Sequence, residues 1–355
     1  MAKKKEPVCM SVDVGNGHVK LTTWQGGRGT KVADTVPVFS FPSFTTPVRG
    51  DDSLNGIGGL SKLEVVVVDV DGIKFRVGPD AIAAAAGRST RNPTDTFYLS
   101  QEYLALFRGA LSYMDLPEDC DQIDILGFGL PLTVYKNESI RESVLQRLKG
   151  SHSITCPKTG RTRQVRIDKV CLIPQLVSAL VAINMQRGTL ESIGERTSLI
   201  IDAGFGTVLW LTAEGLKPQI SRCGGSRGGV SALLSAFADA IDPAFARDPL
   251  VMERIDRALC KGSPTVTISG KDYSIADYMP AVQDQIARNL REMEDSVGMI
   301  GSIDEINLIG GGASLYLPVI QRIWSGRDVS IPAENAQFLN LIGYQVQAEH
   351  AGSKA

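Results

Sequence analysis

Short apolar runs alternate with segments in which apolar residues recur every three or four positions. The apolar runs predict buried strands over 8–14, 123–127, 198–202 and 305–309, each followed by a glycine-containing turn or a polar segment. The clearest helical spacing predicts a helix over 275–297. This order of elements favours an α/β chain with largely buried mixed sheets.

Glycine-containing turns between neighbouring strands predict several hairpins. These pair 8–14 with 18–24, 65–70 with 73–77, and 198–202 with 208–212, and a further hairpin turns at 157–160 and returns as 164–173. Further helices are predicted over 99–114, 138–148, 174–187, 230–241, 313–324 and 336–346. We expect the helix 174–187 to begin at Pro174, because a first helical turn tolerates proline. Residues 78–98 predict a short helix and then an exposed polar loop that contains Arg88 and Arg91.

The composition is that of a globular protein with room for two domains. Of 355 residues, 43% are hydrophobic and 21% charged, which argues against a disordered, collagen-like or coiled-coil chain. The 37 basic and 39 acidic residues give a net charge of −2, so bulk coating of nucleic acid is not expected. We expect a cytoplasmic protein without a membrane partner, since neither a membrane-length apolar run nor a secretory signal is recognised.

The cysteines and histidines do not suggest a zinc site. The six cysteines form no CxxC pair, and the three histidines lie far apart along the chain. We therefore expect reduced thiols and no metal centre built from these residues.

The first candidate site is the turn after the strand 8–14. Asp13 is followed by Gly15, Asn16 and Gly17, and Lys20 lies on the returning strand. Glycines let a tight turn present backbone N–H groups to phosphate oxygens. An aspartate would repel phosphate directly, so a Mg²⁺ ion, held through water, is expected between them.

A second copy of this pattern follows the strand 198–202. Asp202 precedes Ala203, Gly204, Phe205, Gly206 and Thr207. One such hairpin is commonly structural, and the pair can still be two structural turns with edge aspartates. The matching position of the two aspartates favours instead two related domains that bind one ligand.

The third candidate is the strand 305–309, which runs into Gly310, Gly311, Gly312 and Ala313. Three glycines bring backbone close to a flat ligand, although a packed strand-to-helix turn also uses glycine. No Gly-Lys-Ser/Thr follows, so this is not a Walker A loop, and the first hairpin does not match GxGxxG opening a helix.

Taken in this order, the three motifs resemble those of the actin, sugar-kinase and heat-shock-chaperone ATPase superfamily. They correspond to its phosphate-1, phosphate-2 and adenosine motifs. The sequence is most similar to the bacterial plasmid-segregation actins of the ParM/StbA type, through Asp13–Gly17, the Gly129–Leu132 segment, Ile173–Gln175, the segment Gly224–Val230 and the closing segment Leu339–Gly343.

This resemblance implies two duplicated actin-like (ribonuclease H-like) domains with mixed sheets around a nucleotide cleft. Domain I is expected over 8–173 and 328–350, domain II over 174–327, and flexible tails over 1–7 and 351–355. The implied ligands are ATP or GTP and Mg²⁺.

The resemblance also assigns roles to residues. Asp13, Asp202 and Gln175 are the implied catalytic residues, and the two aspartates also hold the metal through water. The implied nucleotide contacts are Gly15, Asn16, Gly17, Lys20, Gly204, Phe205, Gly206, Thr207, Gly228, Gly310, Gly311, Gly312 and Ala313.

Gln175 stands where members of the family position the attacking water. A neutral amide can orient water but is a poor proton acceptor, so we expect positioning rather than general-base catalysis. The alternative is a solvated glutamine in a first helical turn. Asn16 and Gly17 stand where relatives often carry hydroxyl residues, so phosphate contact is expected to depend on backbone N–H groups.

The implied function is that of an ATPase that polymerises head to tail with ATP and Mg²⁺. It would act in plasmid DNA segregation through a DNA-bound adaptor protein, without touching nucleic acid itself. Two alternatives stay open: a small-molecule kinase of the same superfamily, and a nucleotide-dependent scaffold that does not polymerise.

Overall fold

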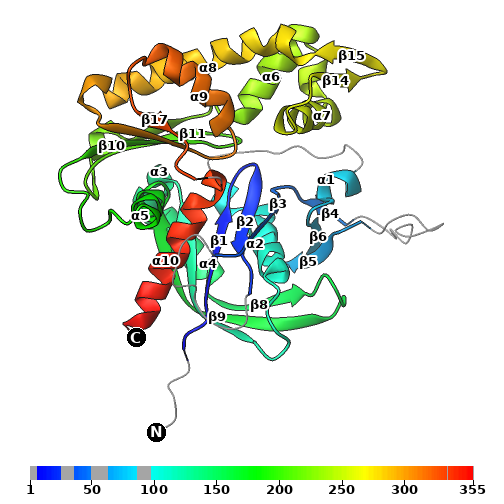
Figure 1. Ribbon diagram of the computed structural model, residues 1–355. Helices are drawn as coiled ribbons and strands as arrows, with labels where there is room; N and C mark the ends of the chain where they lie inside the picture. The colour runs from blue at the N-terminus through cyan, green and yellow to red at the C-terminus, as the bar shows by residue number, and fades with distance from the viewer. Residues whose placement is uncertain (1–5, 25–35, 49–62, 86–96, 334, 355) are drawn as a thin grey trace. The chain divides into compact units, whose positions relative to one another are not determined.

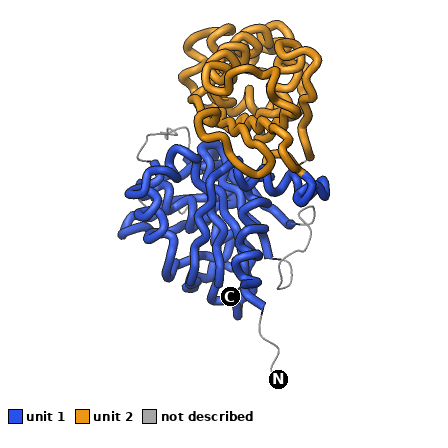
Figure 2. The backbone as a smooth tube through the Cα atoms, turned by 90° about the vertical axis from the view of Figure 1, so that its left-hand side faces the viewer, with its two compact units in different colours: residues 1–192, 338–355 blue, residues 193–337 orange. Residues whose placement is uncertain are grey.

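The computed structural model describes residues 6–24, 36–48, 63–85, 97–333 and 335–354. The chain forms two compact units (Figure 2). Unit 1 comprises residues 1–192 and 338–355, and unit 2 comprises residues 193–337. The expected domain boundaries at 174 and 328 therefore differ from the unit boundaries.

Two expected features lie wholly or largely outside the described residues. The polar stretch that contains Arg88 and Arg91 falls in the range 86–96, and the N-terminal tail falls mostly in the range 1–5. The expected flexible tail at 351–355 overlaps a helix that ends at Ser353.

The main sheet of unit 1 has six strands in the order β3-β2-β1-β7-β9-β8 (Figure 1). They are β1 Cys9–Val14, β2 His18–Thr22, β3 Val38–Pro42, β7 Gln122–Leu130, β8 Gly150–Thr155 and β9 Thr162–Pro174. Strand β1 is antiparallel to β2 and parallel to β7. The mixed sheet expected from the sequence is confirmed.

Helices cover both faces of this sheet. They are α2 Gln101–Tyr113, α3 Leu132–Lys136, α4 Glu138–Leu148, α5 Val177–Gln186 and α10 Leu339–Ser353. On one face, Val12 and Phe128 belong to a buried cluster with Phe107 of α2. On the other face, α10 runs along β1 and β7 (Figure 1), and a Cβ at Gly127 would lie 2.6 Å from the Tyr344 carbonyl oxygen. The glycine thus lets the helix backbone approach the sheet.

A smaller sheet in unit 1 has the order β4-β6-β5. Its strands are β4 Thr46–Pro47, β5 Val66–Val70 and β6 Ile73–Val77, and the short helix α1 Ala81–Ala84 follows. The hairpin of β5 and β6 turns at Asp71 and Gly72, both with positive φ, as expected of an Asp-Gly turn.

The main sheet of unit 2 repeats the arrangement at the centre of unit 1. Its strand order is β12-β11-β10-β16-β17, with β13 paired to β11. The strands are β10 Thr197–Ala203, β11 Val208–Glu214, β12 Lys217–Pro218, β13 Gly224–Ser226, β16 Glu305–Ile309 and β17 Val329–Ser330. Strand β10 is antiparallel to β11 and parallel to β16, as β1 is to β2 and β7. The predicted duplication is therefore present in the sheets.

The remaining elements of unit 2 are α6 Val230–Ile241, α7 Pro249–Cys260, β14 Thr265–Ile268, β15 Lys271–Ser274, α8 Ile275–Val297 and α9 Ala313–Ile323. The bounds of α8 match the prediction, and its apolar stripe is buried at Val282, Ile286 and Leu290. Helix α7 was not predicted, although the sequence carries a helix start there. Asp248 accepts hydrogen bonds from two first-turn N–H groups, and Pro249 is the first helical residue.

Among the described residues, no helix combines the length and apolar character needed to cross a membrane.

Candidate functional site

The first glycine turn closes the hairpin of β1 and β2 in unit 1. The Gly15 N–H donates to the His18 carbonyl oxygen at 3.2 Å, and the flanking strands pair Val14 with Val19. A Cβ at position 15 would lie 3.1 Å from the same oxygen, so the turn is tight. Turns of this kind can present main-chain N–H groups to phosphate oxygens.

Ser43 holds the first turn from beyond the end of β3. Its N–H donates to the Gly17 carbonyl oxygen at 2.8 Å, and its hydroxyl donates to the Gly15 carbonyl oxygen. These bonds engage two acceptors whose partial negative charge would repel a phosphate. No sequence pattern indicates this role of Ser43, because the contact depends on how β3 pairs with β2.

Asp13 lies at the end of β1 and is 3% exposed. The Gln175 Nε2 donates to its Oδ1 at 3.0 Å, and the Lys20 Nζ lies 3.7 Å from its Oδ2. Lys20 is also its cross-strand partner in the hairpin. The structure therefore brings together three residues that the sequence singled out, and the carboxylate keeps lone pairs available for metal-bound water.

Gln175 reaches Asp13 because the chain turns sharply after β9. Pro174 is the last residue of β9, and the Gln175 N–H donates to the Leu130 carbonyl oxygen at 2.8 Å. Leu176 has φ +69°, and α5 begins only at Val177. The prediction that Pro174 opens a helix is wrong, because the chain is still bonded to β7 at Gln175. Gln175 belongs to the turn and is half-buried against Asp13, not solvated in a first helical turn.

The second glycine turn, in unit 2, has the same main-chain bonding as the first. The Gly204 N–H donates to the Thr207 carbonyl oxygen at 3.0 Å, and the flanking strands pair Ala203 with Val208. A Cβ at Gly204 would lie 3.0 Å from that oxygen. Each turn thus joins its first glycine to the residue three positions later, directly after a strand that carries an aspartate.

The start of α6 is packed against the second turn. The Val230 N–H donates to the Gly204 carbonyl oxygen at 2.9 Å, and the Ser231 N–H donates to that of Phe205 at 2.8 Å. A Cβ at Gly229 would lie 2.5 Å from the Phe205 oxygen. Gly206 lies at the middle of this turn, and the glycine before α6 allows the close approach.

Gly228 is held by two buried side chains that the sequence reading did not single out. The Asn289 Nδ2 and the Tyr316 hydroxyl donate to its carbonyl oxygen at 2.6 and 2.9 Å. A Cβ at position 228 would lie 2.2 Å from the Asn289 Oδ1. Burial raises the pKa of Tyr316, so the phenol stays protonated and remains a donor.

The third glycine turn lies beside Asp202 in unit 2. Strand register pairs Asp202 with Ile309, the residue before Gly310. The Gly312 N–H donates to the Ala203 carbonyl oxygen at 2.9 Å. Ala313 follows as the buried first residue of α9. Unit 2 therefore gathers the predicted phosphate-2 and adenosine motifs in one place.

The single carboxylate beside each glycine turn suits a magnesium ion held mainly through water. Among the described residues, no group of three or more His, Cys, Asp or Glu side chains could hold a metal by itself. Mg²⁺ usually keeps several waters and takes one or two carboxylates together with substrate phosphates. Each of the two carboxylates, taken within its own unit, therefore fits a nucleotide-borne metal and does not fit an all-protein metal cage.

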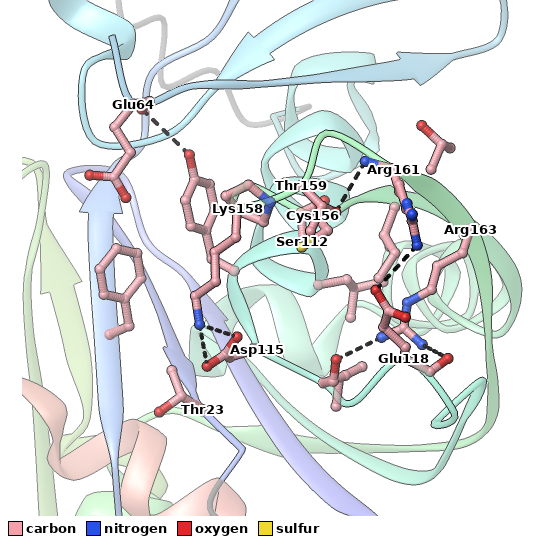
Figure 3. A pocket seen from close by; sticks show the side chains of 17 residues that line it. Thr23, Glu64, Ser112, Asp115, Glu118, Cys156, Lys158, Thr159, Arg161 and Arg163 are labelled. Atoms are coloured by element: carbon pink, nitrogen blue, oxygen red, sulfur yellow. Dashed lines mark hydrogen bonds and ion pairs between the residues drawn. The ribbon is translucent and has the colours of Figure 1, made fainter. Parts of the chain in front are cut away.

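A separate pocket of about 460 Å³ lies in unit 1 (Figure 3). It is lined partly by Tyr113, Asp115, Cys156 and Lys158, and it includes Thr23, which follows β2 at the end opposite the glycine turn. The Lys158 Nζ lies 2.7 Å from the Asp115 carboxylate in an exposed ion pair. No predicted site residue lines this pocket, so it is distinct from the glycine turns.

Both parts of the chain match models of actin-like domains. Residues 11–177 match the N-terminal domain of actin-like proteins, and residues 200–321 match the C-terminal domain of the archaeal actin homologue described as MreB-like. Together these matches span most of the chain, and the sheets described above have the corresponding two-domain fold. The protein belongs to the actin-like superfamily, as the three motifs predicted.

Relatives of similar length support this assignment. Archaeal actin homologues of Thermoplasma acidophilum and Thermoplasma volcanium are each 25% identical over 353 residues, covering 97% of this chain and 99% of theirs. The archaeal actin homologue Ta0583 in complex with ADP shares the fold with a TM-score of 0.71 and 21% identity, covering 97% of this chain and 99% of that one.

ParM structures are also among those that share the fold. A 15-stranded ParM filament from Clostridium botulinum has a TM-score of 0.71 and 18% identity, covering 99% of this chain and 100% of that one. The expected resemblance to ParM-type actins is therefore confirmed at the level of the fold.

Proposed function

We propose that this protein binds ATP or GTP with Mg²⁺ at its two glycine turns, hydrolyses the nucleotide and assembles head to tail into filaments. One observation carries the proposal. Asp13 and Asp202 each lie at the end of a central strand, directly before a glycine turn closed by the same main-chain bond. A duplicated acid-and-glycine turn suits a ligand with several phosphates and a metal.

The first turn would receive phosphate oxygens on the N–H groups of Asn16 and Gly17, and the second on those of Phe205, Gly206 and Thr207. The Lys20 Nζ, which lies 3.7 Å from the Asp13 Oδ2, would compensate the negative charge of the phosphates. When bound, Mg²⁺ would supply positive charge to the phosphates, with Asp13 and Asp202 holding its waters.

Gln175 would orient the attacking water. Its Nε2 already donates to Asp13, which leaves the amide oxygen to accept a proton of that water. The water oxygen forms a bond to the terminal phosphorus, and the bridging P–O bond breaks. The electron pair leaves with the nucleoside diphosphate, and the water proton passes to a phosphate oxygen or to solvent.

The purine base of the nucleotide would lie against the third glycine turn and Gly228. Gly310–Gly312 and the start of α9 at Ala313 are fixed against Ala203, and Gly228 is fixed by Asn289 and Tyr316. Rigid supports of this kind suit recognition of a flat ring. The ADP complex of a structural relative supports nucleotide binding by this fold.

Filament formation is supported by a relative whose structure is a ParM filament. Head-to-tail contacts do not close on themselves, so they generate filaments. We infer a role in plasmid DNA segregation in the cytoplasm, with a DNA-binding adaptor protein linking filament to DNA.

The test is light scattering and negative-stain microscopy with ATP·Mg²⁺ and with GTP·Mg²⁺, together with phosphate release. Filaments that form with nucleotide, and turnover abolished in Asp202→Ala, are expected. Protein that stays unassembled at all concentrations would refute polymerisation. Unchanged turnover in Asp202→Ala would refute the assigned site, and turnover that appears only with an added metabolite would instead indicate a small-molecule kinase.

A further inference from the structure

The backbone between Gln175 and α5 has an unusual conformation. Leu176 has φ +69° and ψ −38°, a region that residues with a side chain rarely adopt. No glycine is present there to relieve it. Such a conformation persists only where the surroundings hold it, and it is often found at functional sites.

Two hydrogen bonds, to acceptors on different elements, hold this backbone. The Gln175 N–H is bonded to β7 through Leu130, as described above. The next N–H, that of Leu176, donates to the Asn340 Oδ1 at 2.8 Å, in a buried bond. Asn340 is 3% exposed and lies at the start of α10, far from Leu176 in sequence. A side chain of the C-terminal helix therefore fixes the peptide that follows Gln175.

Backbone contact fixes the position of α10 against α5. A Cβ at Gly343 would lie 2.1 Å from the Ser178 carbonyl oxygen, so the two helices touch there without an intervening side chain. Gly343 lies three positions after Asn340, and residues at this spacing share a helix face. The same face of α10 thus carries both the close contact and the amide that holds Leu176.

We propose that Asn340 is a positioning residue for nucleotide hydrolysis. Its Oδ1 keeps Leu176 in the positive-φ conformation, which directs the Gln175 side chain to Asp13 and to the attacking water. The proposal rests on the proposed function. Without the bond, Leu176 would relax toward an ordinary negative φ, and the Gln175 amide would lose its fixed direction.

The test is a double-mutant cycle between Asn340→Ala and Gln175→Ala. Phosphate release is measured in single turnover, with assembly monitored by light scattering and ADP affinity by calorimetry. Asn340→Ala alone should slow hydrolysis about tenfold, with ADP affinity changed less than about twofold. In the Gln175→Ala background it should change the rate less than about twofold, because the residue through which it acts is gone.

Asn184→Ala is the matched control. Asn184 is also 3% exposed, and its Nδ2 donates to the Leu180 carbonyl oxygen at 2.9 Å within α5. The control removes a buried amide from α5 without touching Leu176, so hydrolysis should stay within about twofold of the wild type. An equal loss in the control would show that any damage to α5 slows hydrolysis, and would overturn the proposal.

Two results would overturn the role of Asn340 while leaving the proposed function standing. These are an unchanged rate in Asn340→Ala, and an equal loss in both backgrounds of the cycle. Absence of wild-type turnover, or full activity of Gln175→Ala, would instead refute the proposed function of the site. If Asn340→Ala does not fold, Asn340→Ser, which removes less volume, takes its place in the same cycle.

Discussion

Gly310 lies so close to the Asp202 carboxylate that any side chain at position 310 would displace that carboxylate. A Cβ at position 310 would lie 2.3 Å from the Asp202 Oδ1 and 2.7 Å from the Ala203 carbonyl oxygen. Gly310 also has φ +88°, a conformation that favours glycine. The third turn is thereby fixed against the carboxylate that we assign to the metal.

Gly310→Ala should destabilise the protein and disturb Asp202 together. Strain at a positive φ and the clash with the carboxylate each cost energy, and we expect a loss of about 2–4 kcal/mol in the free energy of unfolding. Urea unfolding measures the loss, and phosphate release should fall with it. A variant as stable as the wild type would contradict this account of Gly310.

Gly311→Ala is a sharper test of ligand approach. A Cβ at position 311 meets nothing within 4 Å among the described residues, so protein packing does not require glycine there. Unfolding free energy should change by less than about 1 kcal/mol. If a nucleotide base lies against this backbone, ADP affinity should fall about tenfold or more, measured by calorimetry. Unchanged affinity would place the base elsewhere.

The local parts of the site could be predicted from the sequence, and the supporting contacts could not. Asp13 and Asp202 precede their glycines in the chain, so a strand-and-turn pattern reveals them without knowledge of the fold. Ser43 and Asn340 act across long sequence separations, through contacts that only the folded sheet and helices create. A single sequence carries no pattern for such contacts.

The start of α5 shows how tertiary bonding can override a local signal. Proline before a helical pattern usually marks a first turn. Here the Gln175 N–H still donates to the Leu130 carbonyl oxygen of β7, so Pro174 does not begin a helix. The chain leaves the sheet after Gln175 and turns through Leu176. The position of Gln175 depends on that difference.

The Cys156 thiol should be more reactive than the Cys9 thiol, because their pKa values are shifted in opposite directions. The Thr159 hydroxyl bonds to its sulfur, and with the Thr159 and Lys158 N–H groups it lowers the pKa of the Cys156 thiol, although burial acts in the opposite direction. Burial, followed by the charges of Glu349 and Asp124, raises the pKa of Cys9 to about 12. At neutral pH, Cys156 therefore holds more thiolate than Cys9.

Limited alkylation with iodoacetamide, followed by peptide mass spectrometry, measures this difference. Cys156 should be modified at least about tenfold faster than Cys9. Thr159→Val removes the hydroxyl donor and should slow the labelling of Cys156 without changing that of Cys9. Equal rates at the two cysteines in the wild type would contradict the argument.

His152 should make folding stability depend on pH. The side chain is 2% exposed, its Nε2 lies 2.9 Å from the Leu148 carbonyl oxygen, and its Nδ1 has no hydrogen-bond partner in the described part of the chain. Burial lowers the pKa of His152, and the charge of Arg108 adds to the effect, while the bond to Leu148 opposes it. The folded protein therefore disfavours the protonated ring.

The sign of the effect follows from the proton balance. An unfolded histidine has a pKa of about 6.5, and the folded value is lower, so between the two values the unfolded chain binds more protons. The contribution of neutral His152 to the free energy of unfolding is complete above pH ~6.5 and is lost as the pH falls toward the folded pKa.

The measurement is urea unfolding at pH 7.5 and at pH 5.5. The free energy of unfolding should fall less between these two pH values in His152→Gln than in the wild type. His350→Gln is the control, because His350 is exposed and its replacement should leave the wild-type loss unchanged. The same loss in His152→Gln as in the wild type would show that other groups cause the pH dependence.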